Sequence, residues 1–479
     1  MVNHASLVNA YWAWEAAYQL SSVKNHLQMA NFAFDVFTGD LVRALCSGGK
    51  LVLCPRDLLL EADKLYQLIQ QQQIDCGEFV PVVLRNLMQH LQETQQQLDM
   101  SLVICGSDSW YGREYNHFRK FLGKQTRLIN SFGVTEATID SCYFETTRDI
   151  APEQLVPIGK PFANTQLYIL DQQKRSLPIG VAGELYIGGV GVARGYLNRP
   201  ELTAEKFINP PAFGIPLIKG GRGDRLYKTG DKARYLSALK DTASHNGNIE
   251  FLGRIDNQVK LRGFRIELEE IEVILSQHPL VTENVVILRE DNPGDKKLVA
   301  YLVPLANKPL PLTELRNFLR EKLPEYSLPS AFVFLEQLPL SPNGKIDRKS
   351  LPIPTQNCNV TNKYTPPSNA IEEILAGIWA KILHLQRVGI HDNFFDLGGH
   401  SLLATQVISR IREAFAIELP IRCLFESPSV AQLAQTLIEK EATPGITEKR
   451  ARILQKLDNM SPEETKRLLQ QKRDTAKAT

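Results

Sequence analysis

The sequence contains 479 residues, and its 55 basic and 53 acidic side chains leave a net charge of +2. A chain of this length predicts two to four domains, and the small net charge argues against binding to nucleic acid or to an anionic membrane. The cysteines include no C-x-x-C pair and the histidines no H-E-x-x-H spacing, which argues against a zinc site. We find no signal peptide and no apolar run long enough to cross a bilayer, and therefore expect a cytoplasmic protein.

Residues 1 to about 255 predict an α/β unit that continues into a β-rich segment. Short apolar runs at Lys50–Leu53 and Leu102–Cys105 indicate buried strands. From about residue 155, strands are separated by glycine and proline. The glycine-rich run Gly188–Gly195 lacks the G-x-G-x-x-G register of a nucleotide loop, so we interpret it as a turn.

A second unit is predicted from residue 256 to 352. Strand patterns at Val285–Leu288 and Leu298–Val303, with a helical pattern at Leu312–Leu323, indicate a small α+β domain. Residues 353–369 form a linker by composition, with prolines near both ends.

Residues 370–440 predict an all-α unit. The apolar side chains of Ile371–Leu383 recur at helical spacing and share one face. Further helices are predicted after Ser401 and near Val430–Ile438.

Residues 441–479 form a charged tail. Ser461, followed by proline and two glutamates, predicts the start of a short helix. A solvated tail is favoured over a segment that docks on another protein, because runs of charge are usually solvated.

The stretch Asp392–Leu403, DNFFDLGGHSLL, places one hydroxyl, Ser401, at the start of a helical pattern. A serine at this position lies near free backbone N–H groups at the positive end of the helix dipole, which can receive an anion. A lone serine there is most often only a cap. The whole stretch, however, resembles the attachment site of a phosphopantetheine carrier domain. The resemblance implies that a phosphopantetheinyl transferase attaches 4'-phosphopantetheine to Ser401.

Other stretches resemble the adenylation domain of a nonribosomal peptide synthetase, a member of the adenylate-forming enzyme family. They are NSFGVTEAT (130–138), GELYIGGVGVARGY (183–196), YKTGD (227–231), GRIDNQVKLRGFRIELEEIE (253–272), LPEYSLP (323–329) and PLSPNGKIDRKSL (339–351). The resemblance implies a multidomain protein in which each predicted unit has a role. Its parts are an incomplete α/β adenylation core over 1–255, a mobile α+β subdomain over 256–352, a linker over 353–369, a four-helix carrier domain over 370–440 and a charged tail over 441–479.

The resemblance also implies a site for ATP. Asp231 would hold the ribose hydroxyls, and Arg254 would add a donor near them. Phe132 would stack on adenine, Gly133 would belong to the same ATP site, and Thr135 would contact phosphate. An aspartate after glycine, taken alone, is usually only a turn residue.

Three further roles follow from the same resemblance. Glu136 would bind Mg²⁺ as a hard oxygen ligand. Lys345 would be the mobile catalytic lysine that neutralises charge while the amino-acid carboxylate attacks the α-phosphate. Asp256 would be the hinge about which the smaller subdomain swings between adenylation and thioester formation.

The substrate pocket is implied position by position. Asp35 would hold the ammonium group of the substrate, which argues against a ligase for acyl or aryl acids. Glu78 and Asp140, among small and apolar groups, would be costly without a cation, and Gly39 leaves room for length. The pattern resembles that associated with ornithine, which we rank before lysine and arginine. The remaining wall positions are Val36, Val103, Cys105, Ser131 and Ile139.

The sequence departs from the family at its beginning and at Val134, which replaces the usual proline. We find no Ser/Thr/Gly-rich phosphate loop and no lobe before it, and Met1–Asn9 resembles the segment that follows this loop. We therefore expect an N-terminally truncated adenylation domain. Either the reading frame is truncated, or another chain supplies the front half.

Two functions remain open at this stage. The chain either activates a basic amino acid and loads it on Ser401, or acts only as a carrier, with an inactive adenylation remnant. Neither a condensation motif (H-H-x-x-x-D-G) nor a thioesterase elbow (G-x-S-x-G) is found. Peptide bond formation and release would therefore require other synthetase modules.

Overall fold

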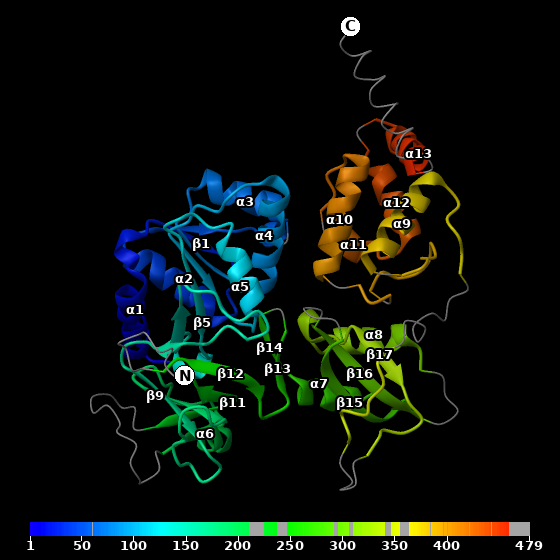
Figure 1. Cartoon of the computed structure of the whole chain (residues 1–479). Coiled ribbons are helices and arrows are strands. Elements are labelled where there is room, and N and C mark those ends of the chain that lie inside the picture. Colours follow the sequence, from blue (N-terminus) through cyan, green and yellow to red (C-terminus); the bar gives the residue numbers. More distant parts are fainter. Residues whose placement is uncertain are drawn as a thin grey trace. The chain divides into compact units, whose positions relative to one another are not determined.

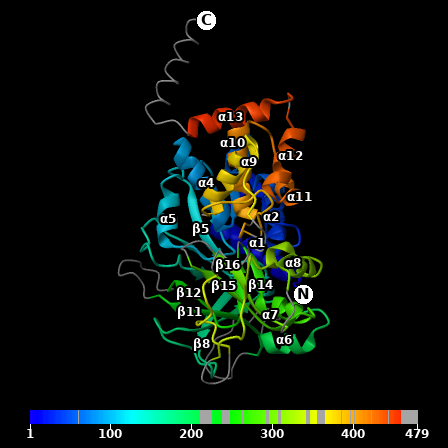
Figure 2. The same ribbon diagram turned by 90° about the vertical axis from the view of Figure 1, so that its right-hand side faces the viewer.

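The computed structural model forms two compact units, Met1–Leu268 and Glu269–Thr479 (Figure 1, Figure 2). The described residues of the second unit include two separate hydrophobic clusters, presented in turn below. The structure describes residues 1–59, 61–209, 225–236, 247–261, 263–291, 296–305, 310–340, 346–354, 364–383, 385–395, 397–399, 401–420, 422–441 and 443–458.

A seven-stranded sheet in the order β2-β1-β3-β4-β5-β6-β7 organises the first unit. Strands β1 to β5 run parallel, and β6 and β7 are antiparallel to their neighbours. The carboxyl ends of parallel strands share one edge of a sheet, where α/β proteins bind their ligands. The strands are β1 (Asn25–Gln28), β2 (Lys50–Leu53), β3 (Cys76–Phe79), β4 (Leu102–Cys105), β5 (Arg127–Phe132), β6 (Cys142–Glu145) and β7 (Lys160–Pro161).

Helices cover both faces of this sheet, as its alternating side chains require. Leu102 and Ile104 of β4 belong to a core with α1 and α2, whereas Val103 and Cys105 belong to a core with α3, α4 and α5. The α/β prediction for this part of the chain is confirmed. The helices are α1 (His4–Tyr18), α2 (Asp35–Cys46), α3 (Ala62–Gln71), α4 (Pro81–Thr94) and α5 (Gly112–Arg119).

An antiparallel sheet follows in the same unit, in the order β10-β11-β9-β8 with β12 paired to β11. Its core includes Phe132, so the sheet packs where β5 ends. The hairpin β13–β14 also reaches this edge, because Phe264 contacts Phe34 and Lys260 lies over the ring of Phe132. The elements are β8 (Thr165–Leu170), β9 (Gly183–Gly189), α6 (Pro200–Lys206), β10 (Phe207–Ile208), β11 (Leu226–Tyr235), β12 (Ile249–Arg254), β13 (Gln258–Leu261) and β14 (Phe264–Glu267).

The second unit begins with the predicted α+β fold. Strands β15 and β16 are antiparallel, and β17 joins β16 in parallel. Val285, Val299 and Tyr301 form the centre of its core and are fully buried. The elements are α7 (Leu268–Ser276), β15 (Val281–Glu290), β16 (Lys296–Pro304), α8 (Leu312–Arg320) and β17 (Ala331–Phe334).

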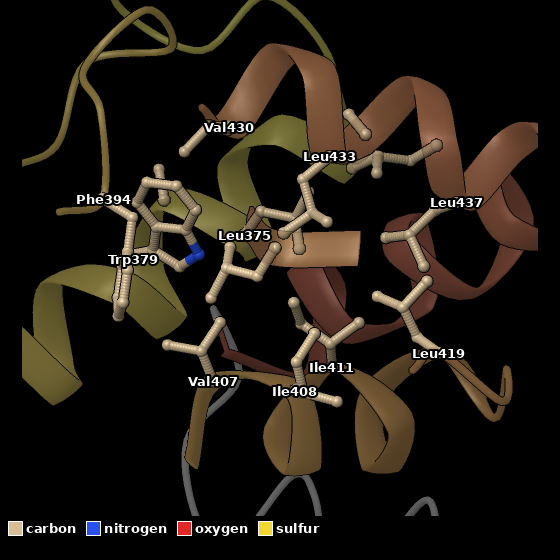
Figure 3. Close-up of a cluster of buried hydrophobic side chains, with 14 of the residues drawn as sticks. Leu375, Trp379, Phe394, Val407, Ile408, Ile411, Leu419, Val430, Leu433 and Leu437 are labelled. Carbon is tan, nitrogen blue, oxygen red and sulfur yellow. The ribbon is translucent and has the colours of Figure 1, made fainter. Parts of the chain in front are cut away.

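A helical bundle with its own core completes the described chain. Trp379 and Phe394 pack against each other at one side of this core, with Leu375 near them (Figure 3). Ala451 of α13 is 0% exposed in the same core, so residues beyond 440 contribute a packed helix. The helices are α9 (Ala370–Leu383), α10 (Ser401–Phe415), α11 (Arg422–Glu426), α12 (Val430–Glu439) and α13 (Ile446–Asp458).

The helix expected from Ser461 lies outside the described residues. Among the helices that the structure describes, none combines the length and the apolar character needed to span a bilayer. The all-α prediction for residues after the linker is confirmed by the bundle.

Candidate functional site

A buried arginine lies among the acidic residues assigned to the substrate pocket. Arg43, on α2, is 1% exposed and donates hydrogen bonds to Asp40 Oδ1 at 2.9 Å and to Asp140 Oδ2 at 3.3 Å. It also donates to Glu78 Oε2, and its guanidinium lies 4.8 Å from the centre of the Trp14 ring. The protein itself therefore pairs Glu78 and Asp140, and the expectation that they face only small and apolar groups is wrong.

Two of the carboxyl groups around Arg43, those of Asp40 and Asp140, have raised pKa values. Burial, opposed by the charge of Arg43, raises the pKa of Asp40 to about 7. Burial and the negative charge of Glu78 raise the pKa of Asp140 to about 8, and the charge of Asp35 adds to this effect. Asp35 is the first residue of α2 and is half-buried. Three carboxyl groups contact this single guanidinium, so the cluster contains more acidic groups than Arg43 can neutralise.

The structure corrects two of the predicted wall positions. Val103 and Cys105 of β4 are fully buried against α4 and α5, on the face of the sheet opposite to Arg43. Their neighbour Ile104 pairs with Glu78 across the parallel ladder and points to the same face. Side chains alternate along a strand, so a shift of one residue moves a side chain to the other face.

Gly106, the residue after Cys105, lies beside two of the predicted site residues. A Cβ atom at Gly106 would lie 2.5 Å from Ser131 Oγ and 3.3 Å from Glu78 Oε1, so only glycine leaves room beside these two groups. Ile104 and Gly106, and not Val103 and Cys105, therefore lie on the side of the sheet that carries Glu78.

The remaining wall positions come together on α2 and on the loop after β5. A Cβ atom at Gly39 would lie 3.5 Å from both Arg43 Nη2 and Ile139 Cδ1. The space that Gly39 leaves is thus bordered by a guanidinium and an apolar side chain. Val36 lies three positions before Gly39, in the first turn of the same helix.

The predicted ribose-binding residues also lie together. Arg254 Nη1 donates to Asp231 Oδ1 at 2.9 Å, and its Nε donates to Asp256 Oδ1 at 2.7 Å. The antiparallel register of β11 and β12 places Asp231 directly opposite Arg254. Asp231 is 0% exposed, and its Oδ2 has no hydrogen-bond partner in the described part of the chain. A buried acceptor of this kind favours a hydroxyl donor from a ligand.

The predicted adenine-binding segment lies at the end of β5. Phe132 is 6% exposed, and Lys260 Nζ lies 4.7 Å from the centre of its ring. Gly133 passes so close to the Ile139 carbonyl that a Cβ atom would lie 1.7 Å from that oxygen, which excludes other residues. Thr135 begins a short 3₁₀ helix, Thr135–Ala137, and is exposed. Lys260 thus covers one face of the aromatic ring that was expected to stack on adenine.

Helix α10 of the bundle begins at Ser401, the residue predicted to carry phosphopantetheine. The chain before it is shaped by glycine, because Gly398 has a φ of +93°. A Cβ atom at Gly399 would lie 2.4 Å from the ring of Phe394, which is fully buried. The backbone conformation at Gly398 and the close approach at Gly399 explain why glycine occupies both positions shortly before Ser401.

Family models match most of the units described above. A model of AMP-binding enzymes matches residues 1–197, a model of the C-terminal domain of AMP-binding enzymes matches 270–345, and a model of the phosphopantetheine attachment site matches 373–437. The order of these matches follows the order of the folds. The chain is an adenylation domain followed by a carrier domain.

Known relatives of the two domains are peptide synthetases. The chain is 45% identical over 446 residues to gramicidin S synthase 2 of Brevibacillus brevis, covering 92% of this chain and 10% of that protein. It is 44% identical over 444 residues to bacitracin synthase 2 of Bacillus licheniformis, covering 92% and 16% respectively. The chain therefore spans a small part of these relatives.

A solved structure has the same two domains. It is that of holo-PA1221, an NRPS protein containing adenylation and PCP domains bound to a vinylsulfonamide inhibitor. The TM-score is 0.68 with 27% identity, covering 89% of this chain and 67% of that chain. The adenylation domain is thus an adenylate-forming enzyme domain, a class that uses ATP and Mg²⁺, and the carrier domain is of the type that holds 4'-phosphopantetheine.

The residue expected to bind Mg²⁺ is engaged by other side chains. Arg265 of β14 donates to Glu136 Oε2 at 2.8 Å, and Tyr196 donates to Glu136 Oε1 at 2.7 Å. Burial opposes ionisation of Glu136, but the charge of Arg265 and the hydrogen bonds lower its pKa overall. No group of three or more His, Cys, Asp or Glu residues that could hold a metal occurs among the described residues. The site in this arrangement does not fit Mg²⁺.

The catalytic lysine expected at Lys345 lies outside the described residues. The sequence analysis missed Arg43, Arg265 and Tyr196, which contact the predicted acidic residues directly. For Arg43 a signal existed, because it follows Gly39 by one helical turn and so shares its face. Arg265 and Tyr196 both lie in stretches that resemble the adenylation family, but their contacts with Glu136 join residues 129 and 60 positions apart and leave no local pattern.

Proposed function

We propose that the adenylation domain activates an amino acid with a basic side chain, with ornithine preferred over lysine and arginine. The amino-acid carboxylate would attack the α-phosphate of ATP, forming an aminoacyl adenylate and releasing pyrophosphate. The thiol of phosphopantetheine on Ser401 would then attack the acyl carbon and displace AMP, forming a thioester.

One observation carries this proposal, namely the charge balance around Arg43. Asp40, Glu78 and Asp140 pair with this single guanidinium, and Asp35 acts on Asp140 from α2. Buried carboxylates without a cation are costly, so they either keep protons or bind a positive group. A diamino acid supplies two ammonium groups, one for Asp35 and one for the acids beside Arg43.

The residue roles follow this assignment. Asp231 and Arg254 would hold the ribose of ATP, and the unpartnered Asp231 Oδ2 supports this role. Lys345 would neutralise charge during adenylation, and Asp256 would be the hinge. The proposed substrate wall consists of Asp35, Val36, Gly39, Glu78, Ile104, Gly106, Ser131, Ile139 and Asp140.

Partners are proposed on the same basis. A phosphopantetheinyl transferase would modify Ser401, and condensation and thioesterase modules of a synthetase would use the thioester.

Amino-acid-dependent exchange of pyrophosphate into ATP tests this function. We expect exchange with ornithine above lysine and arginine, measured with the chain alone and with a front-half adenylation partner. The absence of exchange with every basic amino acid in both conditions would refute the substrate assignment.

Intact mass measurement after incubation with a phosphopantetheinyl transferase tests the carrier. One phosphopantetheine adduct should form on the chain and be lost in Ser401→Ala. An adduct without any self-acylation would identify the chain as a carrier-only binding module.

A further inference from the structure

Arg43 lies on the face of α2 that carries the proposed substrate positions. It follows Gly39 by four residues and Asp35 by eight, so all three lie along one side of the helix. Because Gly39 has no side chain, the Arg43 guanidinium reaches back beside it, with Nη2 3.5 Å from the position of a Gly39 Cβ.

The guanidinium is held rigidly from several elements. Asp40 comes from α2, Glu78 from β3 and Asp140 from the loop after β5. The Trp14 ring of α1 lies 4.8 Å from the guanidinium carbon, a separation typical of cation–π contacts. A group fixed on so many sides forms a wall of constant position for any molecule bound next to it.

The cluster is nevertheless incompletely neutralised. Asp40 is 4% exposed, and its Oδ2 has no hydrogen-bond partner in the described part of the chain. Its other oxygen bonds Arg43, so this unpartnered atom belongs to the same cluster. An orphaned buried acceptor beside a guanidinium favours one more donor, and a second ammonium group would provide it.

We propose that Arg43 determines substrate specificity in this adenylation domain by setting the length of the cationic side chain that fits. This inference rests on the proposed function. An ornithine ammonium would end beside Arg43 and share Glu78 and Asp140 with it. A longer side chain would meet the guanidinium itself, which both occupies the space beside Gly39 and repels a second guanidinium. Arg43 thus accepts ornithine by contacts to shared acids and rejects arginine by repulsion.

A purely structural counter-ion would behave differently from a specificity residue. Its removal would weaken binding of all basic amino acids by a similar factor, because the acids would be disordered or protonated. A specificity residue, when replaced by a smaller neutral one, leaves space and negative charge, so that longer cations gain relative to ornithine. The order of affinities is therefore the decisive readout.

The test uses the full chain, with binding measured by calorimetry without ATP, so that the readout does not depend on adenylation. The probes are L-ornithine, L-lysine, L-arginine and L-norvaline, the last being the uncharged analogue of ornithine. The main variant combines Arg43→Met with Asp40→Asn, which removes the guanidinium together with the carboxyl group that it pairs with on the same helix. Arg43→Lys is the matched variant that keeps the positive charge at the site but shortens its head group.

We expect the wild type to bind ornithine most tightly and norvaline most weakly. The double variant should shift the ratio of arginine to ornithine affinity by at least about tenfold in favour of arginine, on the scale of one specific charge contact. Arg43→Lys should give an intermediate shift, which remains measurable if the double variant does not fold. An unchanged order of affinities in the folded variants would overturn the role of Arg43 and leave the proposed function intact. A wild type that binds no basic amino acid would overturn both.

Discussion

Replacement of Asp140 by asparagine should remove a large part of the pH dependence of stability. The pKa of Asp140 is raised to about 8 in the folded chain, against 3.8 as its ordinary value, mainly by burial. Between these values the folded state holds a proton that the unfolded state has lost, so stability falls as pH rises. The slope for one such group is about 1.4 kcal/mol per pH unit, or about 2.7 kcal/mol from pH 5 to pH 7.

The assay is urea unfolding of wild type and Asp140→Asn at several pH values between 5 and 8. Asparagine resembles the protonated aspartate, so the two proteins should be similar near pH 5 and the variant should become relatively more stable as pH rises. Asp171→Asn is the matched control, because hydrogen bonds from Arg175 lower the pKa of Asp171 and it contributes no slope in this range. Parallel curves for wild type and Asp140→Asn would refute the reasoning.

Other changes test the nucleotide site, the carrier domain and the engaged carboxylate. Arg254→Ala should cost about 3–5 kcal/mol of stability and weaken AMP binding in calorimetry, because it leaves a fully buried carboxylate unpaired. Gly399→Ala should lower the melting temperature of the carrier domain, because the added methyl group overpacks the core at a cost of about 1–3 kcal/mol. Gly377→Ala in α9 is the control: a Cβ atom there meets no atom within 4 Å beyond its own stretch of helix, so this change should be neutral or stabilising. Arg265→Ala should raise the pKa of Glu136, measured by NMR titration, because burial remains while the opposing charge is lost.

Each of these expectations has a clear contrary result. Unchanged AMP affinity in Arg254→Ala would remove that side chain from the nucleotide site. Equal melting of the two glycine variants would show that the close approach at Gly399 is unimportant. An unchanged pKa of Glu136 in Arg265→Ala would show that this ion pair has little effect in solution.

Strand β4 shows which features could be predicted from the sequence and which could not. The run Leu102–Cys105 is apolar throughout, so it predicted a buried strand correctly but carried no mark of which residues face the site. The register with β3 and β5 shows that Ile104 faces Glu78, while Val103 and Cys105 pack under α4 and α5. In a strand buried on both faces, hydrophobicity cannot distinguish the two sets.

The pairing of the buried charges around Arg43 also depends on tertiary packing. The sequence identified Glu78 and Asp140 as costly charges, but Arg43 pairs with Asp140 across 97 positions of the chain. Such a pair depends on the packing of α2 against the sheet and leaves no local pattern. The inference of a basic substrate now depends on incomplete neutralisation of the cluster, with Asp40 as an additional member.

The sequence by itself determined the order of the domains, most strands and helices, and the stretches that carry chemistry. These features depend on local periodicity, turn residues and short motifs, which are written in consecutive residues. The tertiary structure alone decided which side chains meet, namely Arg43 with three acids, Arg265 and Tyr196 with Glu136, and Ile104 with the substrate wall. Such contacts arise when elements distant in sequence are brought together by strand pairing and core packing, and therefore had to be observed in space.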